Sequence, residues 1–326
     1  MDSTRPVTLE YVHPAAEPAP VPPSRASGVA MLIAASVLWS LSGVVVKVVN
    51  IGPAAFAFWR SLGAALIMLA LLPLGRGRLP PLPWMLASAT LYTVVVSLLI
   101  TSMSASTAAT GILLQYTAPL FCALFARVFL RRRISRGTLA AMSVAAVGIG
   151  IMVWGGWKGD HWVGPVTGLV SGAAFGALIL VLERVDRAAG PGGANPFAIV
   201  LFNNAGAAAI LLPLCAWQGA LPAAPWKVGL VCVTGVVQLA IPYVLFQLAL
   251  RRVKPVDASL LILLEPVLNP VWVALATSER PDAFTLAGGM AILAAMVVEA
   301  VKPANEERPA PRGFEPVVAE APPPQR

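Results

Sequence analysis

The chain has 326 residues and a formal net charge of +8; 58% of the residues are hydrophobic, only 12% are charged, and the mean hydropathy is +0.78. Soluble domains carry about 25% charged residues, so this composition excludes an ordinary soluble enzyme. Basic proteins often bind nucleic acid, but in a chain this apolar we expect the positive charges to mark orientation in a lipid bilayer, and we expect no nucleic acid partner.

The predicted elements begin after a polar, proline-rich segment, 1–27, which lacks the 7–15-residue apolar region of a signal peptide. A similar segment, 302–326, ends the chain, and we expect both to be disordered cytoplasmic tails. Between them lie ten apolar runs, each close to the ~20 residues of a membrane-spanning helix. The runs are 28–49, 54–74, 83–103, 107–130, 137–154, 163–182, 196–217, 226–248, 256–277 and 283–301. They are long and lack a two-residue alternation, which predicts an all-α membrane protein with ten transmembrane helices.

The basic residues predict how these helices are oriented. If the N-terminus is cytoplasmic, 17 of the 23 Lys and Arg residues fall on the cytoplasmic side and three fall outside. Trp154, Trp157 and Trp162 then flank one outer loop, and Trp217 and Trp226 flank another, at the level where indole rings anchor a membrane protein. We therefore expect a multi-pass protein of the cell inner membrane with both termini in the cytoplasm.

The two halves of the sequence resemble each other. When the sequence is aligned with itself so that Pro119 coincides with Pro266, the Thr-Leu-Ala of 138–140 coincides with that of 285–287. We call this register the proline alignment. Matches among Ala and Leu are common in apolar sequences, but the proline and the Thr-Leu-Ala block are harder to dismiss. The pattern indicates an internal repeat.

A second match, at a slightly smaller offset, places the Gly-Ala-Ala of 63–65 on that of 206–208, and we call it the Gly-Ala-Ala alignment. The predicted repeats, 28–156 and 163–301, then hold five helices each. Because five is odd, the second copy enters the membrane inverted, which is a recurring plan of transporters with a site near the midplane.

Four stretches of the sequence carry a resemblance to a known family. They are Leu-Trp-Ser at 38–40 with Lys47, the stretch 53–60 ending in Phe-Trp-Arg, Leu-Gln-Tyr-Thr-Ala-Pro at 114–119, and Leu-Leu-Glu-Pro-Val at 263–267 followed by Glu279-Arg280. Together they resemble the EamA-like transporters of the drug/metabolite transporter superfamily, over nearly all of 28–301. The resemblance implies a ten-helix carrier that exports or exchanges small metabolites.

Basic residues near the helix ends admit more than one interpretation. The first repeat of this family often has an acidic residue after its fourth helix, where this chain has Arg131-Arg132-Arg133. We interpret that departure as a change in loop electrostatics with little bearing on the pathway. Lys47 is expected to extend to the lipid headgroups. Arg60, about six residues into the second helix, either does the same or attracts an anionic group of the substrate.

Glu265 is the sharpest candidate for function. A charge in the middle of a membrane helix costs roughly 2.5–3.5 kcal/mol on insertion scales and normally faces a cavity or a partner. Glu265 therefore binds a substrate amine or exchanges a proton, or else it is protonated and packs against a neighbouring helix. Pro266 and Pro270 follow, with Asn269 between them, and predict a hinged helix beside a polar cavity.

Other polar and aromatic residues in the apolar runs are candidate substrate contacts, with helix packing as the alternative for each. In the fourth run these residues precede a further predicted hinge, Pro119. The candidates are Gln115, Tyr116, Thr117, Trp39, Asn203, Tyr243, Asn269 and Trp272.

These features favour a secondary active transporter of amino acids or related small metabolites, working by alternating access around Glu265, with export as the direction that the resemblance implies. A proton-coupled efflux carrier for drugs or cations is the alternative. An intramembrane enzyme would need a pair of carboxylates, or a nucleophile with a base, at membrane depth. Glu265 is the one central carboxylate of this sequence and no histidine lies in an apolar run, so we expect no catalytic residues. Three scattered cysteines without a C-x-x-C pair predict no metal site and no cofactor. The carrier is expected as a monomer or a homodimer.

Overall fold

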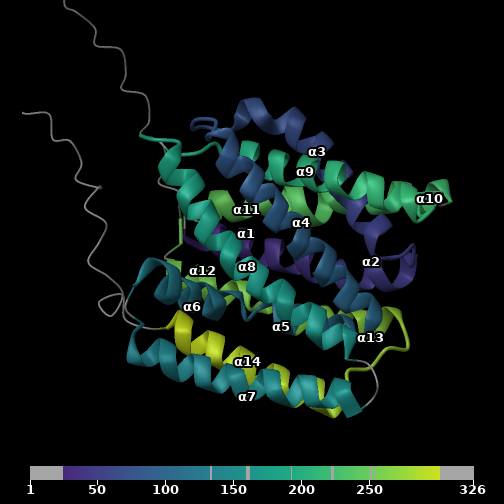
Figure 1. Ribbon diagram of the computed structural model, residues 1–326, viewed down its shortest axis with the longest axis vertical. Helices are drawn as coiled ribbons and strands as arrows, with labels where there is room; N and C mark the ends of the chain where they lie inside the picture. Colours follow the sequence, from purple (N-terminus) through teal and green to yellow (C-terminus); the bar gives the residue numbers. More distant parts are fainter. Residues whose placement is uncertain are drawn as a thin grey trace, which may run out of the picture.

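The computed structural model describes residues 25–132, 134–158, 162–191, 193–221, 224–249, 252–253 and 255–301. Within these residues the regular structure is helical, apart from one isolated bridge between Arg78 and Ala194. The helices pack into one bundle (Figure 1). The predicted tails, 1–27 and 302–326, lie outside the described residues, except that the first helix already begins at Arg25.

The helices follow one another with short connections. The described residues of the first half form α1 (Arg25–Ser40), α2 (Ser42–Val49), α3 (Pro53–Leu71), the 3-10 turn η1 (Leu72–Leu74), α4 (Leu82–Ala105), α5 (Ala108–Gln115), α6 (Ala118–Leu130) and α7 (Arg136–Lys158). The second half forms α8 (Val163–Ala188), α9 (Pro196–Trp217), α10 (Pro225–Gly235), the π-helix η2 (Val236–Ala240), α11 (Ile241–Ala249), α12 (Pro255–Ile262), α13 (Leu264–Ala276) and α14 (Ala283–Ala300).

Several of these helices join end to end into single membrane spans. Within the described ranges, nine helices are long and apolar enough to cross a membrane, and Leu260–Ala276 forms a shorter apolar helix in the place of the ninth predicted run. The all-α membrane fold predicted from the sequence is therefore confirmed. The break between α12 and α13 lies inside this helix, as the break between α5 and α6 lies inside the span Ala108–Leu130.

Two spans are interrupted at equivalent places of the repeat. α5 ends at Gln115, four residues before Pro119, and α12 ends at Ile262, four residues before Pro266. Proline lacks the N–H that would bond the carbonyl four residues back, and its ring crowds that carbonyl. Both interruptions therefore follow from the two prolines that define the proline alignment. Pro270, in contrast, lies inside α13 without ending it.

The helix contacts show the two-fold relationship between the halves. α3 packs on α9 and α7 on α14, each helix meeting its own counterpart. The contacts of α4 with α8 and α9 are matched by those of α11 with α1 and of α10 with α3. Likewise, α5 and α6 contact α8, whereas α12 and α13 contact α1. This exchange is what two inverted five-helix repeats produce. Figure 1 shows α7 and α14 side by side along one edge of the bundle.

The repeat extends to the way in which helices begin. At the start of α7, Oγ of Ser135 accepts a hydrogen bond from the N–H of Thr138 at 3.1 Å. At the start of α14, Oδ1 of Asp282 accepts one from the N–H of Thr285 at 2.6 Å. Both are N-cap bonds. The proline alignment places Ser135 on Asp282 and Thr138 on Thr285, so the same cap occurs in both copies.

Candidate functional site

The centre of the site joins the two interrupted spans. Tyr116 follows the end of α5, and Glu265 lies in the first turn of α13. The Tyr116 hydroxyl donates to Oε2 of Glu265 at 2.7 Å and lies 3.1 Å from the carbonyl oxygen of Ile262. That carbonyl is the one left without its helical partner by Pro266. The sequence-predicted residues Tyr116 and Glu265 are thus brought together, and the two proline breaks meet.

Arg60 brings a positive charge to the same centre from α3. It lies within electrostatic range of Glu265 and of Tyr92 on α4. It belongs to none of the ion pairs found among the described residues. Its Nε is buried and has no hydrogen-bond partner there. Arg60 and Glu265 therefore bring a guanidinium and a carboxyl group to one region of the bundle, and they form no ion pair with each other among the described residues.

Tyr92 is a residue of this site that the sequence analysis missed. Its hydroxyl donates to Oδ1 of Asn204 at 2.9 Å, while Nδ2 of Asn204 donates to the carbonyl of Val200 in its own helix. The available signal was the presence of a tyrosine in the middle of an apolar run. The bond to Asn204 holds the Tyr92 hydroxyl against α9, and Tyr92 lies within electrostatic range of Arg60.

Asn203, a predicted substrate contact, faces α4. Its Oδ1 accepts a hydrogen bond from the hydroxyl of Ser88 at 2.8 Å, and its side chain is buried. This bond holds α4 against α9 one turn away from the Tyr92–Asn204 bond. A role of Asn203 in binding stays a prediction beside this observed role in packing.

The interruption between α1 and α2 is held by polar residues of α13. Nε1 of Trp272 donates to the Ser40 hydroxyl at 2.9 Å, and Nδ2 of Asn269 donates to the Ser40 carbonyl at 2.9 Å. Asn269 is fully buried, and its Oδ1 has no partner among the described residues. Two of the predicted residues, Asn269 and Trp272, thus connect the first span to the same helix that carries Glu265.

The remaining candidates are less directly connected to this centre. The Trp39 ring lies tilted against the Phe246 ring with a centroid distance of 5.9 Å, and Tyr243 packs against a small apolar cluster around Met68. Thr117 is fully buried and donates to the carbonyl of Leu114 in the turn between α5 and α6. Binding roles for these residues and for Gln115 stay predictions.

Ion pairs join the two repeats at opposite ends of the bundle. After α13, Glu279 pairs with Lys47 of α2 at 2.5 Å, and its second oxygen accepts the N–H of Ala108 at 2.8 Å. After α6, Arg132 pairs with Glu183 of α8 at 2.9 Å. We call these the Lys47 end and the Arg132 end; in Figure 1 they lie at the right, near α2 and α13, and at the left, near α6. Lys47 is therefore held by a carboxylate, which the sequence analysis did not foresee.

Interrupted helices that meet in a polar centre, within two inverted repeats, define a multi-pass transporter. The sequence matches the EamA-like transporter family over residues 26–154 and again over 162–299, so the chain belongs to that family. The family was already suggested by the motifs around Trp39, Arg60, Tyr116 and Glu265.

Curated relatives carry transporter names. A 28% identical protein of Pseudomonas aeruginosa, matched over 83% of this chain and 95% of its own length, is named pseudopaline exporter CntI. A protein of Archaeoglobus fulgidus, also 28% identical over 61% of this chain and 69% of its own length, is named an uncharacterized transporter. A solved crystal structure shares the fold, with a TM-score of 0.57, 17% identity and coverage of 85% of this chain and 98% of the other.

Proposed function

We propose that this transporter moves small organic metabolites by alternating access, and that Glu265, Tyr116 and Arg60 form its central binding site. The observation that carries the proposal is the contact between Tyr116 and Glu265, where the interrupted spans of the two repeats meet. Discontinuous helices with free backbone groups surround the substrate sites of many inverted-repeat carriers. A hinge at the same place lets the two halves rock around the bound molecule.

The charges favour a substrate with both an amine and a carboxylate. Glu265 suits the cationic group, and Arg60, whose Nε lacks a partner among the described residues, suits the anionic one. A charged side chain within a membrane is costly unless a partner compensates it. A zwitterion would compensate both at once. Amino acids and related metabolites are therefore the proposed substrate class.

Orientation and direction rest on separate observations. The Arg132 end carries most of the basic loop residues, so the positive-inside rule makes it the cytoplasmic end. Both termini are then cytoplasmic, in the inner membrane. Export is the proposed direction because a relative that covers most of the chain is named an exporter.

A proton-coupled carrier of lipophilic cations is the alternative, and Glu265 alone favours it. Such a carrier needs a membrane carboxylate to exchange a proton or bind the cation, together with aromatic residues such as Tyr116 and Trp39. It has no need of Arg60. The two functions therefore differ in what the loss of the guanidinium does.

Counterflow into liposomes containing the purified protein tests the proposal. The labelled panel comprises zwitterionic amino acids, carboxylates without an amine, and lipophilic amines. We expect exchange of zwitterions, abolished in Glu265→Gln and in Arg60→Gln but retained in the control Arg127→Gln, whose side chain is exposed on α6. Exchange of lipophilic amines that survives Arg60→Gln would establish the alternative. Zwitterion exchange that persists in Glu265→Gln would overturn the central role of that carboxylate.

A further inference from the structure

The internal repeat makes the two ends of the α3–α9 pair directly comparable. In the Gly-Ala-Ala alignment, 52–54 at the start of α3 (Gly-Pro-Ala) correspond to 195–197 at the start of α9 (Asn-Pro-Phe). In the same way, Gly75 after α3 corresponds to Gln218 after α9. The start of one helix lies beside the end of the other, so the junction occurs twice, once at each end of the bundle.

At the Arg132 end, a side chain ties this junction. Oδ1 of Asn195 accepts the N–H groups of Phe197 and Ala198, while its Nδ2 donates to the carbonyl of Gly75 at 3.2 Å. The backbone of Arg78 adds a hydrogen bond in each direction to the segment before α9. Asn195 lies so close to Gly75 that a Cβ there would collide with it. The loop after α3 is thereby fixed to the start of α9.

The space behind this tie is filled by apolar side chains. Met68 of α3 is fully buried in a cluster with Val200 and Ala240, against which Leu71, Phe197 and Tyr243 pack. The Phe197 ring is the largest contribution from the first turn of α9.

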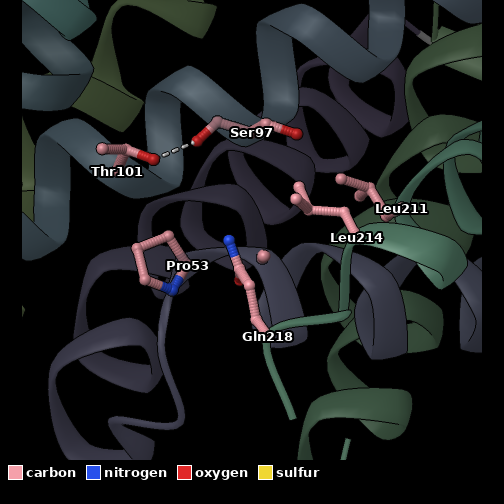
Figure 2. Close-up of a pocket in the computed structure, with 7 residues that line it drawn as sticks. Pro53, Ser97, Thr101, Leu211, Leu214 and Gln218 are labelled. Atoms are coloured by element: carbon pink, nitrogen blue, oxygen red, sulfur yellow. Dashed lines mark hydrogen bonds between the residues drawn. The ribbon is translucent and has the colours of Figure 1, made fainter. Parts of the chain in front are cut away.

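At the Lys47 end the same junction is hollow. In the Gly-Ala-Ala alignment, Gly52 occupies the position equivalent to Asn195 and has no side chain that could tie the junction. Ala54 occupies the position equivalent to Phe197. Leu211 and Leu214 take the places of Met68 and Leu71. A cavity of about 290 Å³ remains, lined by Pro53, Ala54, Ser97, Thr101, Leu211, Leu214 and Gln218 (Figure 2).

Three of the seven residues that line this cavity, Ser97, Thr101 and Gln218, can form hydrogen bonds with a guest. Oγ of Ser97 is buried without a hydrogen-bond partner among the described residues. The amide of Gln218 points into the cavity beside Pro53, and its helix neighbour Leu214 lies on the far side (Figure 2). The volume is close to the lower limit of small-molecule pockets. A small solute with hydrogen-bonding groups therefore fits it better than a large apolar compound.

We propose that this cavity is the outer vestibule of the transport pathway, and that Ala54 and Gly52 keep it open where Phe197 and Asn195 close its counterpart. The proposal rests on the function and orientation given above and adds where the substrate enters or leaves. The amide of Gln218, which occupies the position equivalent to Gly75 at the tied junction, contacts the passing solute. The α3–α9 junction is thus open at the Lys47 end, whereas hydrogen bonds of Asn195 and the Phe197 ring close the equivalent junction at the Arg132 end.

Filling the cavity tests the proposal without reference to transport. The probe is Thr101→Cys in a chain whose three native cysteines are replaced, treated in intact cells with a membrane-impermeant maleimide. We expect rapid labelling with Ala54 present and at least tenfold slower labelling with Ala54→Phe. The matched control is Ala70→Phe, at an exposed position of the same helix, which should leave the rate unchanged. Labelling that is slow without the phenylalanine, or unaffected by it, would overturn the vestibule.

The opposite end provides a second variant should Ala54→Phe fail to insert. Phe197→Ala removes the ring that closes the cytoplasmic counterpart, so Leu71→Cys should become reactive in inside-out vesicles. No gain in reactivity would contradict the assigned role of Phe197. Vestibule labelling that responds to Ala54→Phe in a protein that exchanges no zwitterion would instead refute the proposed substrate and leave the vestibule standing.

Discussion

Arg132 and Glu279 occupy equivalent positions of the two repeats in the proline alignment and carry opposite charges. Each forms an ion pair with the opposite repeat, Arg132 with Glu183 and Glu279 with Lys47. Lys47 and Glu183 in turn lie near the ends of the first helix of their own repeats. The arginine run that departs from the family pattern is therefore neutralised in part by Glu183. An equivalent ion pair joins the repeats at both ends, with the basic residue after the fourth helix of the first repeat and the acidic residue after the fourth helix of the second.

Breaking the Lys47–Glu279 pair should destabilise the fold. Both side chains are 18% exposed, and each also bonds backbone near the start of α5. Removing one partner of a buried pair costs about 3–5 kcal/mol, with the lower part of that range expected here because some exposure remains. Glu279→Gln should therefore lower the thermal unfolding midpoint in detergent. Arg280→Gln, which removes a charge whose hydrogen bonds within the described part of the chain go to nearby carbonyls, serves as the control.

The charge-reversed pair Lys47→Glu with Glu279→Lys should recover part of this loss. If the reversed protein is no more stable than the single variants, the two residues do not act as a pair.

Replacing Arg132 by glutamate would restore the acidic residue common in the family but place it against Glu183. With side chains 31% and 28% exposed, the loss should be smaller than at the other end, about 1 kcal/mol. Adding Glu183→Arg should restore part of the stability, because the inter-repeat pair forms again while Arg187 loses its partner within α8. Arg187→Gln is the control, since Arg187 pairs with Glu183 only within α8. A loss in Arg187→Gln as large as in Arg132→Glu would show that the inter-repeat pair has no special weight.

Tyr116→Phe removes the hydroxyl that serves both Glu265 and the carbonyl freed by Pro266. A hydrogen bond contributes about 0.5–3 kcal/mol, with the upper part of the range for a charged acceptor, so the bent span loses stability and Glu265 loses its orientation. We expect an inserted protein with slower counterflow. In a double-mutant cycle with Glu265→Gln the effects should be non-additive, because the residues are in contact. Additive effects would separate Tyr116 from the function of Glu265.

Tyr92→Phe should act on the carboxylate side of the site. Without its hydroxyl, Tyr92 loses the bond to Asn204 and its polar group near Arg60. The expected result is a rise in KM for zwitterions of several-fold with little change in the maximal rate. Ser88→Ala removes the neighbouring α4–α9 bond, to Asn203, and is the matched control. Equal kinetic effects of the two variants would mean that Tyr92 serves packing alone.

The sequence predicts those parts of this molecule that depend on local rules. Apolar run length predicts the spans, and Pro119 and Pro266 predict where two of them break, since a missing N–H acts on its own helix. Pairings between distant helices have no such local signature. The partner of Lys47 and the role of Tyr92 become visible only when the positions of α4, α9 and α13 in the bundle are known. The difference between Ala54 and Phe197 gains its meaning only when the two α3–α9 junctions are recognised as equivalent sites of the repeat.

Two glycines of α10 should respond in opposite ways to the same substitution. A Cβ on Gly235 would collide with the backbone of Arg60 and Ala64, where α10 crosses α3, whereas one on Gly229 would meet open space. Gly229→Ala should stabilise the helix by up to about 1 kcal/mol through propensity. Gly235→Ala should destabilise by about 1–3 kcal/mol, because well-packed helices must separate. It should also impair transport, since the crossing positions Arg60. Unfolding midpoints that shift in the same direction would contradict the close approach of α10 and α3.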